Sequence, residues 1–87
     1  MMVYILYSES LGRYYVGSTR DLKRRLIEHN FGKGNFTSKG IPWNLIIGIE
    51  CDNRSEALKL ELKIKKRGIK RYAQDNGFLD SGGGAAR

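Results

Sequence analysis

The chain has little of several residue types on which other classes of small protein depend. Its 87 residues include one cysteine, one histidine and one proline, so it can form neither an internal disulfide nor a zinc cluster of cysteine and histidine. No apolar run approaches the roughly 18 residues of a membrane span. The longest run, MMVYILY, lacks the basic start and the cleavage site of a signal peptide. We therefore expect a cytoplasmic protein with no membrane partner.

Acidic residues are also few, and this shortage points to a class of partner. Sixteen Lys and Arg stand against nine Asp and Glu, for a formal net charge of +7. Such a balance favours a polyanion, with nucleic acid as the first expectation and an anionic membrane surface as the second. The chain is too short for two cores, and its 40% hydrophobic content is enough for one. We expect one domain.

The first third of the chain predicts a hairpin followed by a helix. VYILY at 3–7 is a continuous apolar run, typical of a strand buried on both faces, and YYVG at 14–17 is expected to pair with it. The segment between them, SESLGR, has the residues of a turn. DLKRRLIEHN at 21–30 predicts a helix that Ser18 or Thr19 caps at its N-terminus.

The remainder predicts a third strand and two further helices. Alternation in WNLIIGIE at 43–50 places four side chains on one side of a strand, namely Trp43, Leu45, Ile47 and Ile49. A longer helix is expected from its cap, Asn53 or Ser55, to about Gly68, and a short one at 69–76. Three strands need a cover, which the helices supply, so the order β-β-α-β-α predicts a small α/β sandwich.

One carboxylate stands out on the longer helix. An apolar arc about 200° wide is expected from Ala57, Leu58, Leu60, Leu62 and Ile64. Glu61 falls near the middle of this arc, where desolvation of a carboxylate costs several kcal/mol unless a cation or metal compensates. Two interpretations stay open. Glu61 either has a functional role, such as holding a metal, or reaches out of the arc to pair with a lysine.

The first helix carries an arginine and a histidine along one edge. Leu22 and Leu26 form its apolar seam, and Arg25 and His29 follow that seam one turn apart. A structural interpretation pairs Arg25 with Asp21 and makes His29 a polar flank. Together with the tyrosine-rich hairpin and a carboxylate, however, these residues are the ingredients of a phosphodiester site. Such a site needs a base, a fixed cation and a metal, and magnesium suits a site with one carboxylate.

Five segments, in this order and spacing, resemble the GIY-YIG nuclease superfamily, and in particular its small single-domain bacterial members. They are VYIL, YYVGST, DLKRRLIEHN, GKGNFTSKGIPWNLI and SEALKLELKIKK. The resemblance covers about residues 2–72 and implies a small three-stranded antiparallel sheet flanked by helices, with an extra C-terminal helix as an option. We expect the nuclease domain at residues 1–76 and a flexible tail at 77–87, where SGGGAAR has the composition of a linker.

The resemblance also implies roles for the hairpin. MVY occupies the position of the first motif, which makes Tyr4 its tyrosine, and YVG occupies that of the second, with Tyr15 and Gly17. Family mechanisms make a motif tyrosine the general base for the attacking water. We assign this role to Tyr4, with Tyr15 shaping the same pocket and nearby cations lowering the pKa of the base. Tyr14, by alternation, faces the other side of the sheet as part of the core.

The helices carry the remaining implied site residues. By position, Arg25 matches the arginine that contacts the scissile phosphate, His29 matches the family histidine, and Glu61 matches the carboxylate that binds Mg²⁺ or Mn²⁺. Asn76 is a further candidate, as the counterpart of a late asparagine. One departure is Phe36, where relatives often have tyrosine.

The resulting prediction is a divalent-metal-dependent DNA endonuclease, with a protein partner as an option for supplying specificity. Six basic residues are expected to contact nucleic acid, namely Lys23, Arg24, Lys33, Lys39, Lys63 and Lys66. The alternative function is a non-catalytic nucleic-acid-binding module with the same fold, and a second rival is a basic structural protein lodged on RNA.

Overall fold

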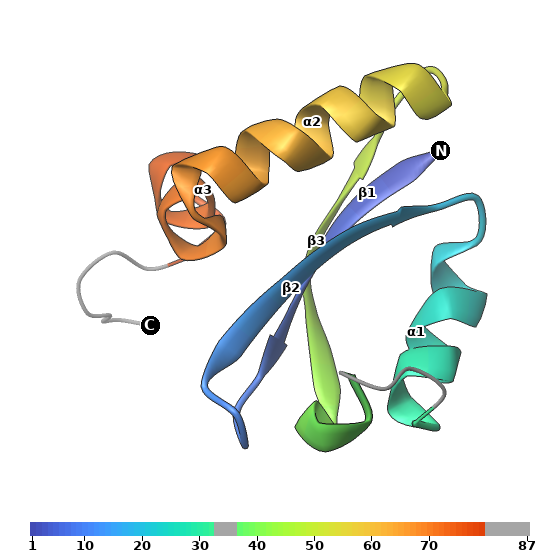
Figure 1. The fold of residues 1–87 in the computed structure, drawn as a ribbon, viewed down its shortest axis with the longest axis vertical. Coiled ribbons are helices and arrows are strands. Elements are labelled where there is room, and N and C mark those ends of the chain that lie inside the picture. Colours follow the sequence, from blue (N-terminus) through green and yellow to red (C-terminus); the bar gives the residue numbers. More distant parts are fainter. Residues whose placement is uncertain (33–36, 80–87) are drawn as a thin grey trace.

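The sheet has three antiparallel strands with the first strand in the middle (Figure 1). The computed structural model describes residues 1–32 and 37–79. Strand β1 (Met2–Ser8) pairs with β2 (Arg13–Thr19) on one side and with β3 (Trp43–Glu50) on the other. The expected antiparallel sheet flanked by helices is confirmed.

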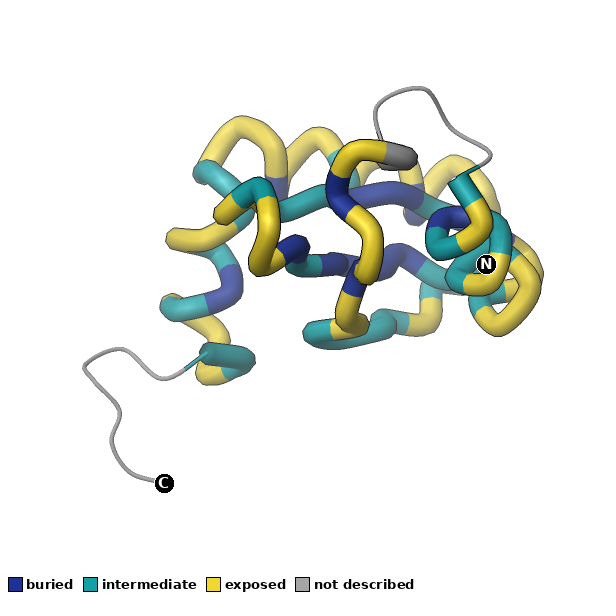
Figure 2. Tube along the Cα trace, turned by 90° about the horizontal axis from the view of Figure 1, so that it is seen from below, coloured by how far each residue is buried: buried dark blue, intermediate teal, exposed yellow. Residues whose placement is uncertain are grey.

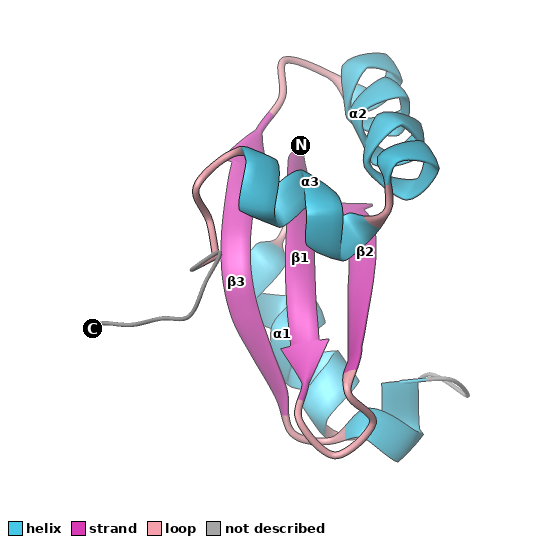
Figure 3. Ribbon diagram, turned by 90° about the vertical axis from the view of Figure 1, so that its left-hand side faces the viewer, coloured by secondary structure: helices cyan, strands magenta, loops and turns pink. Residues whose placement is uncertain are grey.

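Helices cover both faces of this sheet (Figure 3). Helix α1 (Leu22–Asn30) lies on one face, and α2 (Arg54–Arg67) and α3 (Ile69–Asp75) lie on the other. A short 3-10 helix, η1 (Thr37–Gly40), precedes β3. The optional third helix of the sequence prediction is therefore present. In the part of the chain that the structure describes, no helix is long and apolar enough to span a membrane.

The central strand separates two cores of different composition. Val3 and Ile5 pack with Val16, Ala57 and Ile64 on the face that α2 and α3 cover. On the other face, Tyr4 and Leu6 pack with Trp43 and, more peripherally, with Tyr15, Leu22 and Leu26. The tube in Figure 2 is accordingly buried along β1 and exposed on the outer turns of the helices. Both faces of β1 are buried, as its continuous apolar run predicted.

A β-bulge overturns the prediction for the third strand. The register of β1 with β3 shifts between two neighbouring pairs, Ile5 with Ile47 and Leu6 with Leu45. The extra residue, Ile46, interrupts the alternation of side chains along β3. Odd-numbered residues before Ile46 therefore face one side of the sheet, and odd-numbered residues after it face the other. Trp43 therefore belongs to the α1 core while Ile47 packs against the α2 core. The expectation that Trp43, Leu45, Ile47 and Ile49 share one side was wrong.

The helix caps were predicted correctly for α2 but not for α1. The side chain of Asn53 accepts a hydrogen bond from the amide of Glu56 at 2.9 Å, and α2 ends at Gly68 with φ of 98°. The N-cap of α1 is Asp21 instead of Ser18 or Thr19, because β2 continues through Thr19. The Thr19 hydroxyl accepts from the Asp21 amide at 3.1 Å and so fixes the corner between β2 and α1.

The apolar arc expected on α2 was too wide. Leu58 and Leu62 are 45% and 66% exposed, whereas Ala57 and Ile64 are fully buried and Leu60 is half-buried. A helix that lies on one sheet buries only a stripe along its axis, which is narrower than the spread of its apolar residues. At the end of α3 the chain continues with Phe78, whose ring lies 6.3 Å from that of Tyr72 between centroids. The domain boundary expected at residue 76 stays a prediction.

Candidate active site

Three aromatic rings from three elements meet on the α1 face of the sheet. The hydroxyl of Tyr4 on β1 lies 3.0 Å from Nε2 of His29 on α1, and both side chains are buried. The ring of Tyr15 on β2 lies 5.1 Å from the His29 ring and 6.3 Å from the Tyr4 ring between centroids. Hairpin pairing and the docking of α1 thus bring together the two motif tyrosines and the histidine. His29 is a buried partner of Tyr4 and not a polar flank of the helix.

Gly17 makes room for the Tyr4 hydroxyl. The two residues are directly opposed in the pairing of β1 with β2. A Cβ atom at position 17 would lie 2.7 Å from the Tyr4 oxygen, closer than real Cβ contacts come. The backbone of Gly17 has negative or extended φ, so the requirement for glycine here is one of space and not of backbone conformation.

The tyrosine and the histidine are both held in their neutral forms near pH 7. Burial, followed by Tyr15, raises the pKa of Tyr4 well above its usual range. Arg25 lowers this pKa by less than burial raises it, and Glu61 and Glu28 make smaller contributions that raise it. Arg25 thus lowers the pKa of Tyr4 as expected, but burial outweighs it in the protein alone. Burial, followed by the charge of Arg25, lowers the pKa of His29. A neutral imidazole can accept the phenol proton through Nε2 when its other nitrogen carries the hydrogen.

Arg25 has a buried donor without an acceptor. Its Nε lies 3.9 Å from Glu28 Oε1 and makes no hydrogen bond within the described residues, although the side chain as a whole is 40% exposed. The structural interpretation, a pair with Asp21, is not observed, because Arg24 forms that pair. Buried polar atoms in native proteins nearly always have a partner. Arg25 therefore has a donor available for an acceptor that residues 1–32 and 37–79 do not supply.

Glu61 approaches the same region from the opposite face, at the edge of β2. Its Oε1 accepts a hydrogen bond from the Ser18 hydroxyl at 3.3 Å, and its Oε2 lies 3.1 Å from Lys65 Nζ. Because Leu58 and Leu62 are exposed, Glu61 flanks the buried stripe of α2 and does not lie in its middle. Its side chain is nevertheless only 17% exposed. The lysine pair of the structural interpretation is thus present, and the carboxylate is also close enough to influence the pKa of Tyr4.

The donor set around Glu61 fits magnesium better than a metal that needs several protein ligands. Within residues 1–32 and 37–79, no group of three or more His, Cys, Asp or Glu side chains could hold a metal. Magnesium is commonly bound through one or two carboxylates, with waters and substrate phosphate oxygens completing its shell. A single, partly buried carboxylate with a hydroxyl beside it suits this mode of binding. Lys65 would have to move aside, since its ammonium lies where a cation would bind.

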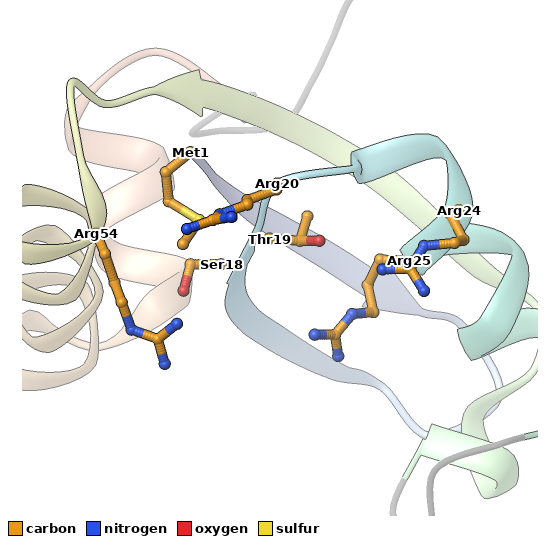
Figure 4. Close-up of a pocket in the computed structure, with 7 residues that line it drawn as sticks. All are labelled: Met1, Ser18, Thr19, Arg20, Arg24, Arg25 and Arg54. Carbon is orange, nitrogen blue, oxygen red and sulfur yellow. The ribbon is translucent and has the colours of Figure 1, made fainter.

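A cavity of about 240 Å³ opens at this edge of the sheet between α1 and α2 (Figure 4). Its walls are the side chains of Met1, Ser18, Thr19, Arg20, Arg24, Arg25 and Arg54. Arg25 belongs both to the cavity and to the surroundings of Tyr4, and Ser18 connects the cavity to Glu61. Sequence reasoning missed Arg20 and Arg54. In the sequence, the only indication of a role was that Arg20 follows β2 and Arg54 begins α2. Those positions become relevant only when the fold brings the two ends of these elements together.

The other residues predicted from the sequence are more scattered. Lys23 and Arg24 lie exposed on α1, and Lys63 and Lys66 lie exposed on α2, across the sheet. Lys39 is exposed on η1. Lys33 and Phe36 lie outside the described residues.

Asn76 is not brought to the tyrosine cluster. It is exposed, and its side-chain amide donates to the Tyr72 carbonyl at 2.9 Å. Tyr72 packs against the α2 core, on the face opposite Tyr4 and His29. Tyr14, by contrast, lies as expected: it packs partly buried against the α2 core, with its ring 4.7 Å from that of Tyr7 between centroids.

Comparison with known proteins identifies the family. Residues 1–73 match the GIY-YIG catalytic domain, and the chain belongs to this family of nucleases. It is 39% identical over 77 residues to the structure-specific endonuclease subunit slx1 of Schizosaccharomyces pombe, which covers 82% of this chain and 28% of the relative. It is also 39% identical over 57 residues to a UPF0213 protein of Streptococcus pneumoniae, covering 64% of this chain and 58% of the relative. The chain thus spans only part of the length of these relatives.

A solved structure shares the fold. The solution structure of a UPF0213 protein from Bacillus halodurans superposes with a TM-score of 0.55 and 28% sequence identity. The match covers 93% of this chain and 86% of the other.

Proposed function

We propose that the chain is a divalent-metal-dependent endonuclease that hydrolyses phosphodiester bonds in DNA. The observation that carries the proposal is the buried Nε of Arg25, which has no hydrogen-bond partner among the described residues, beside the hydrogen-bonded pair of Tyr4 and His29. A cation that lacks an acceptor, next to groups that can exchange a proton, suits an anionic substrate that must be attacked by water. Membership of a nuclease family supports the same conclusion.

Arg25 holds the scissile phosphate in this proposal. Negative charge develops on the phosphate oxygens as water attacks, and a fixed guanidinium stabilises that charge without reorganising. The Nε and the terminal nitrogens of arginine form a planar fork that matches two phosphate oxygens.

Tyr4 and His29 together supply the base. A phenol whose pKa is raised stays protonated near pH 7, so Tyr4 can remove a proton from water only if its own proton leaves at the same time. His29, neutral and 3.0 Å away, is the acceptor for that proton. Tyr15 packs against both rings and shapes the pocket, and Gly17 leaves the space in which the Tyr4 hydroxyl lies.

Glu61 would hold the metal, with the Ser18 hydroxyl as a hydrogen-bond partner of the carboxylate. Bound Mg²⁺ or Mn²⁺ supplies Lewis-acid stabilisation of the phosphate and of the leaving oxygen. We propose DNA as the substrate and the cytoplasm as the location. The fission-yeast relative is by its name a subunit, which supports an additional proposal that a protein partner supplies specificity here too.

A non-catalytic nucleic-acid-binding module is the second candidate. It is favoured by the ion pair of Glu61 with Lys65 and by the complete burial of Tyr4, both of which describe a site closed to substrate. One experiment separates the two functions. Supercoiled plasmid and a panel of duplex, single-stranded, flapped and branched DNA are incubated with the protein, with Mg²⁺ or with EDTA. Metal-dependent nicking supports the enzyme, whereas binding of the panel without cleavage supports the module.

A further inference from the structure

The cavity at the β2 edge carries more positive charge than its surroundings neutralise. Of its four arginines, Arg24 is paired with Asp21 and Glu28, at 3.9 Å and 3.2 Å, and Arg25 lies 3.9 Å from Glu28. Arg20 and Arg54 have no acidic partner within 4.0 Å among the described residues. Figure 4 shows these two side chains on the side of the cavity away from α1, with Ser18 near them. Guanidinium groups gathered around one cavity without full neutralisation create a positive potential that attracts anions.

Size and lining restrict what that anion can be. A volume of about 240 Å³ is below the roughly 300–1,000 Å³ of pockets that hold drug-sized ligands. The described residues that line the cavity include two hydroxyls, Ser18 and Thr19, and no aromatic side chain on which a base could stack. Arginine forks and hydroxyls bind phosphate oxygens. The cavity is therefore suited to a phosphate group and not to a nucleobase.

Both unpaired arginines are attached to well-fixed backbone. Arg20 lies in the corner that the Thr19 hydroxyl closes through hydrogen bonds with the backbone of Asp21, at 3.1 Å and 3.3 Å. Arg54 is the first residue of α2, directly after its cap Asn53. A fixed backbone avoids the entropy cost of ordering a loop when a ligand binds. The fold thus fixes the backbone from which each of the two exposed side chains extends.

We propose that Arg20 and Arg54 form a second phosphate subsite, which holds a phosphodiester next to the scissile one in the same nucleic-acid strand. The inference rests on the proposed function and extends it. Arg25 connects the two subsites, since it lines the cavity and is also close enough to Tyr4 to influence its pKa. Ser18 borders the cavity and contacts Glu61. A strand that places one phosphate on Arg25 therefore directs its neighbour into the cavity.

Salt-dependent binding tests this subsite without requiring cleavage. Arg20→Ala, Arg54→Ala and the double variant are made in a Glu61→Gln background, with Arg71→Ala as a control of equal charge change on α3. Affinity for a fluorescently labelled oligonucleotide, single-stranded and duplex, is measured from low to physiological salt. Each lost phosphate contact should reduce the slope of log K against log salt by about 0.7 for single strands and about 0.9 for duplex. The double variant should lose about twice as much, and Arg71→Ala should leave the slope unchanged.

Equal slopes for the parent, the double variant and Arg71→Ala would overturn the subsite. A second arm titrates inorganic phosphate against thermal stability. If phosphate stabilises the parent but not the double variant while the oligonucleotide slopes stay equal, the cavity binds a free anion, and the strand subsite is again refuted. Because neither arm measures cleavage, absence of plasmid nicking by the unmodified chain would refute the proposed enzyme separately. A smaller slope in the double variant would still support the contact with the strand.

Discussion

The two faces of the sheet are built differently, although the same central strand supplies both. The α2 face buries aliphatic residues, with Val3, Ile5 and Ile64 fully covered. The α1 face buries Tyr4 and His29, which carry polar atoms that bond to each other. A buried polar pair contributes less to stability than an apolar core of the same volume and is costly when broken. We infer that the α2 face stabilises the fold, while the α1 face gives up some stability to keep reactive groups close together.

Glu61 is the exception to this division, because it extends from α2 but belongs to the candidate site. Its substitution should have the largest effect on cleavage. Glu61→Gln keeps the side-chain shape and removes the charge that a metal needs, so metal-dependent plasmid nicking should be eliminated. The melting temperature should change little, because a partly exposed ion pair contributes about 0–1 kcal/mol. Lys65→Gln is the matched control, since it breaks the same pair but leaves the carboxylate. If Glu61 is only structural, both variants should lose stability equally and neither should lose nicking.

Tyr4→Phe tests the α1 face directly. Removing one oxygen should keep the fold and lower the cleavage rate by about 10²–10⁴-fold, the range for a lost acid–base group. Tyr14→Phe, on the α2 face, should cleave normally, and Tyr15→Phe should lose less than Tyr4→Phe. Single-turnover nicking of the three variants provides the measurement. Equal cleavage by all three would show that the tyrosines are core residues and that another group acts as the base.

Arg25→Ala should lower cleavage by about 10²–10³-fold, because the developing phosphate charge loses its fixed partner. Overall DNA binding should weaken only slightly, since many other basic residues share the electrostatic attraction. Arg24→Ala serves as the neighbouring control, and it should cleave nearly as well as the unmodified chain. A binding assay run beside the nicking assay separates the two effects. A large loss of binding together with unchanged cleavage of bound DNA would contradict the assignment.

Acid pH should weaken the α1 face through His29. The pKa of His29 is lowered from its ordinary value of 6.5, so the folded chain binds this proton less readily than the unfolded chain. Stability that depends on the neutral imidazole is therefore complete above about pH 6.5 and is lost as pH falls through the lower folded pKa. Nicking should decrease over the same window, because a protonated ring cannot accept the Tyr4 proton. A rate that is flat from neutral pH to below that window would exclude His29 as the acceptor.

The smallest effect on cleavage is expected from the α2 face. Ile64→Val removes one buried methylene and should cost about 0.5–1.5 kcal/mol of stability. Urea denaturation should report this loss, while nicking at 25 °C stays unchanged because Ile64 belongs to the aliphatic core and not to the cluster of Tyr4. A marked fall in activity of the folded variant would mean that the two faces are coupled more tightly than their separate cores indicate.

The local features of this fold could be read from the sequence, and the non-local ones could not. Asn53 caps α2 as expected, and the turn predicted at SESLGR is present, with Gly12 at a positive φ of 64°, because caps and turns depend on a few neighbouring residues. The bulge at Ile46 could not be foreseen, since it depends on the pairing of two strands about 40 residues apart. The exposure of Leu58 and Leu62 likewise reflects how much of α2 the sheet can cover.

The candidate site likewise has features that the sequence predicted and features that only the structure shows. Tyr4, Tyr15, Arg25 and His29 were selected by type and position, and the fold brings them together on one face. The rise in the pKa of Tyr4 and the open bonding capacity of Arg25 depend on three-dimensional packing, which no spacing in the sequence encodes. The convergence of Arg20 and Arg54 depends on how α1 and α2 flank the edge of β2.

The placement of Tyr4 on the central strand also determines how the site can be lost. Strand β1 is hydrogen-bonded on both sides, and Tyr4 itself is fully buried. Backbone amides in such a position exchange with solvent mainly through global opening, not through fraying at an end. Hydrogen exchange at Tyr4 should therefore be among the slowest in the chain and should report the full free energy of unfolding. On warming, the Tyr4 side chain should then lose its fixed position only when the sheet itself unfolds.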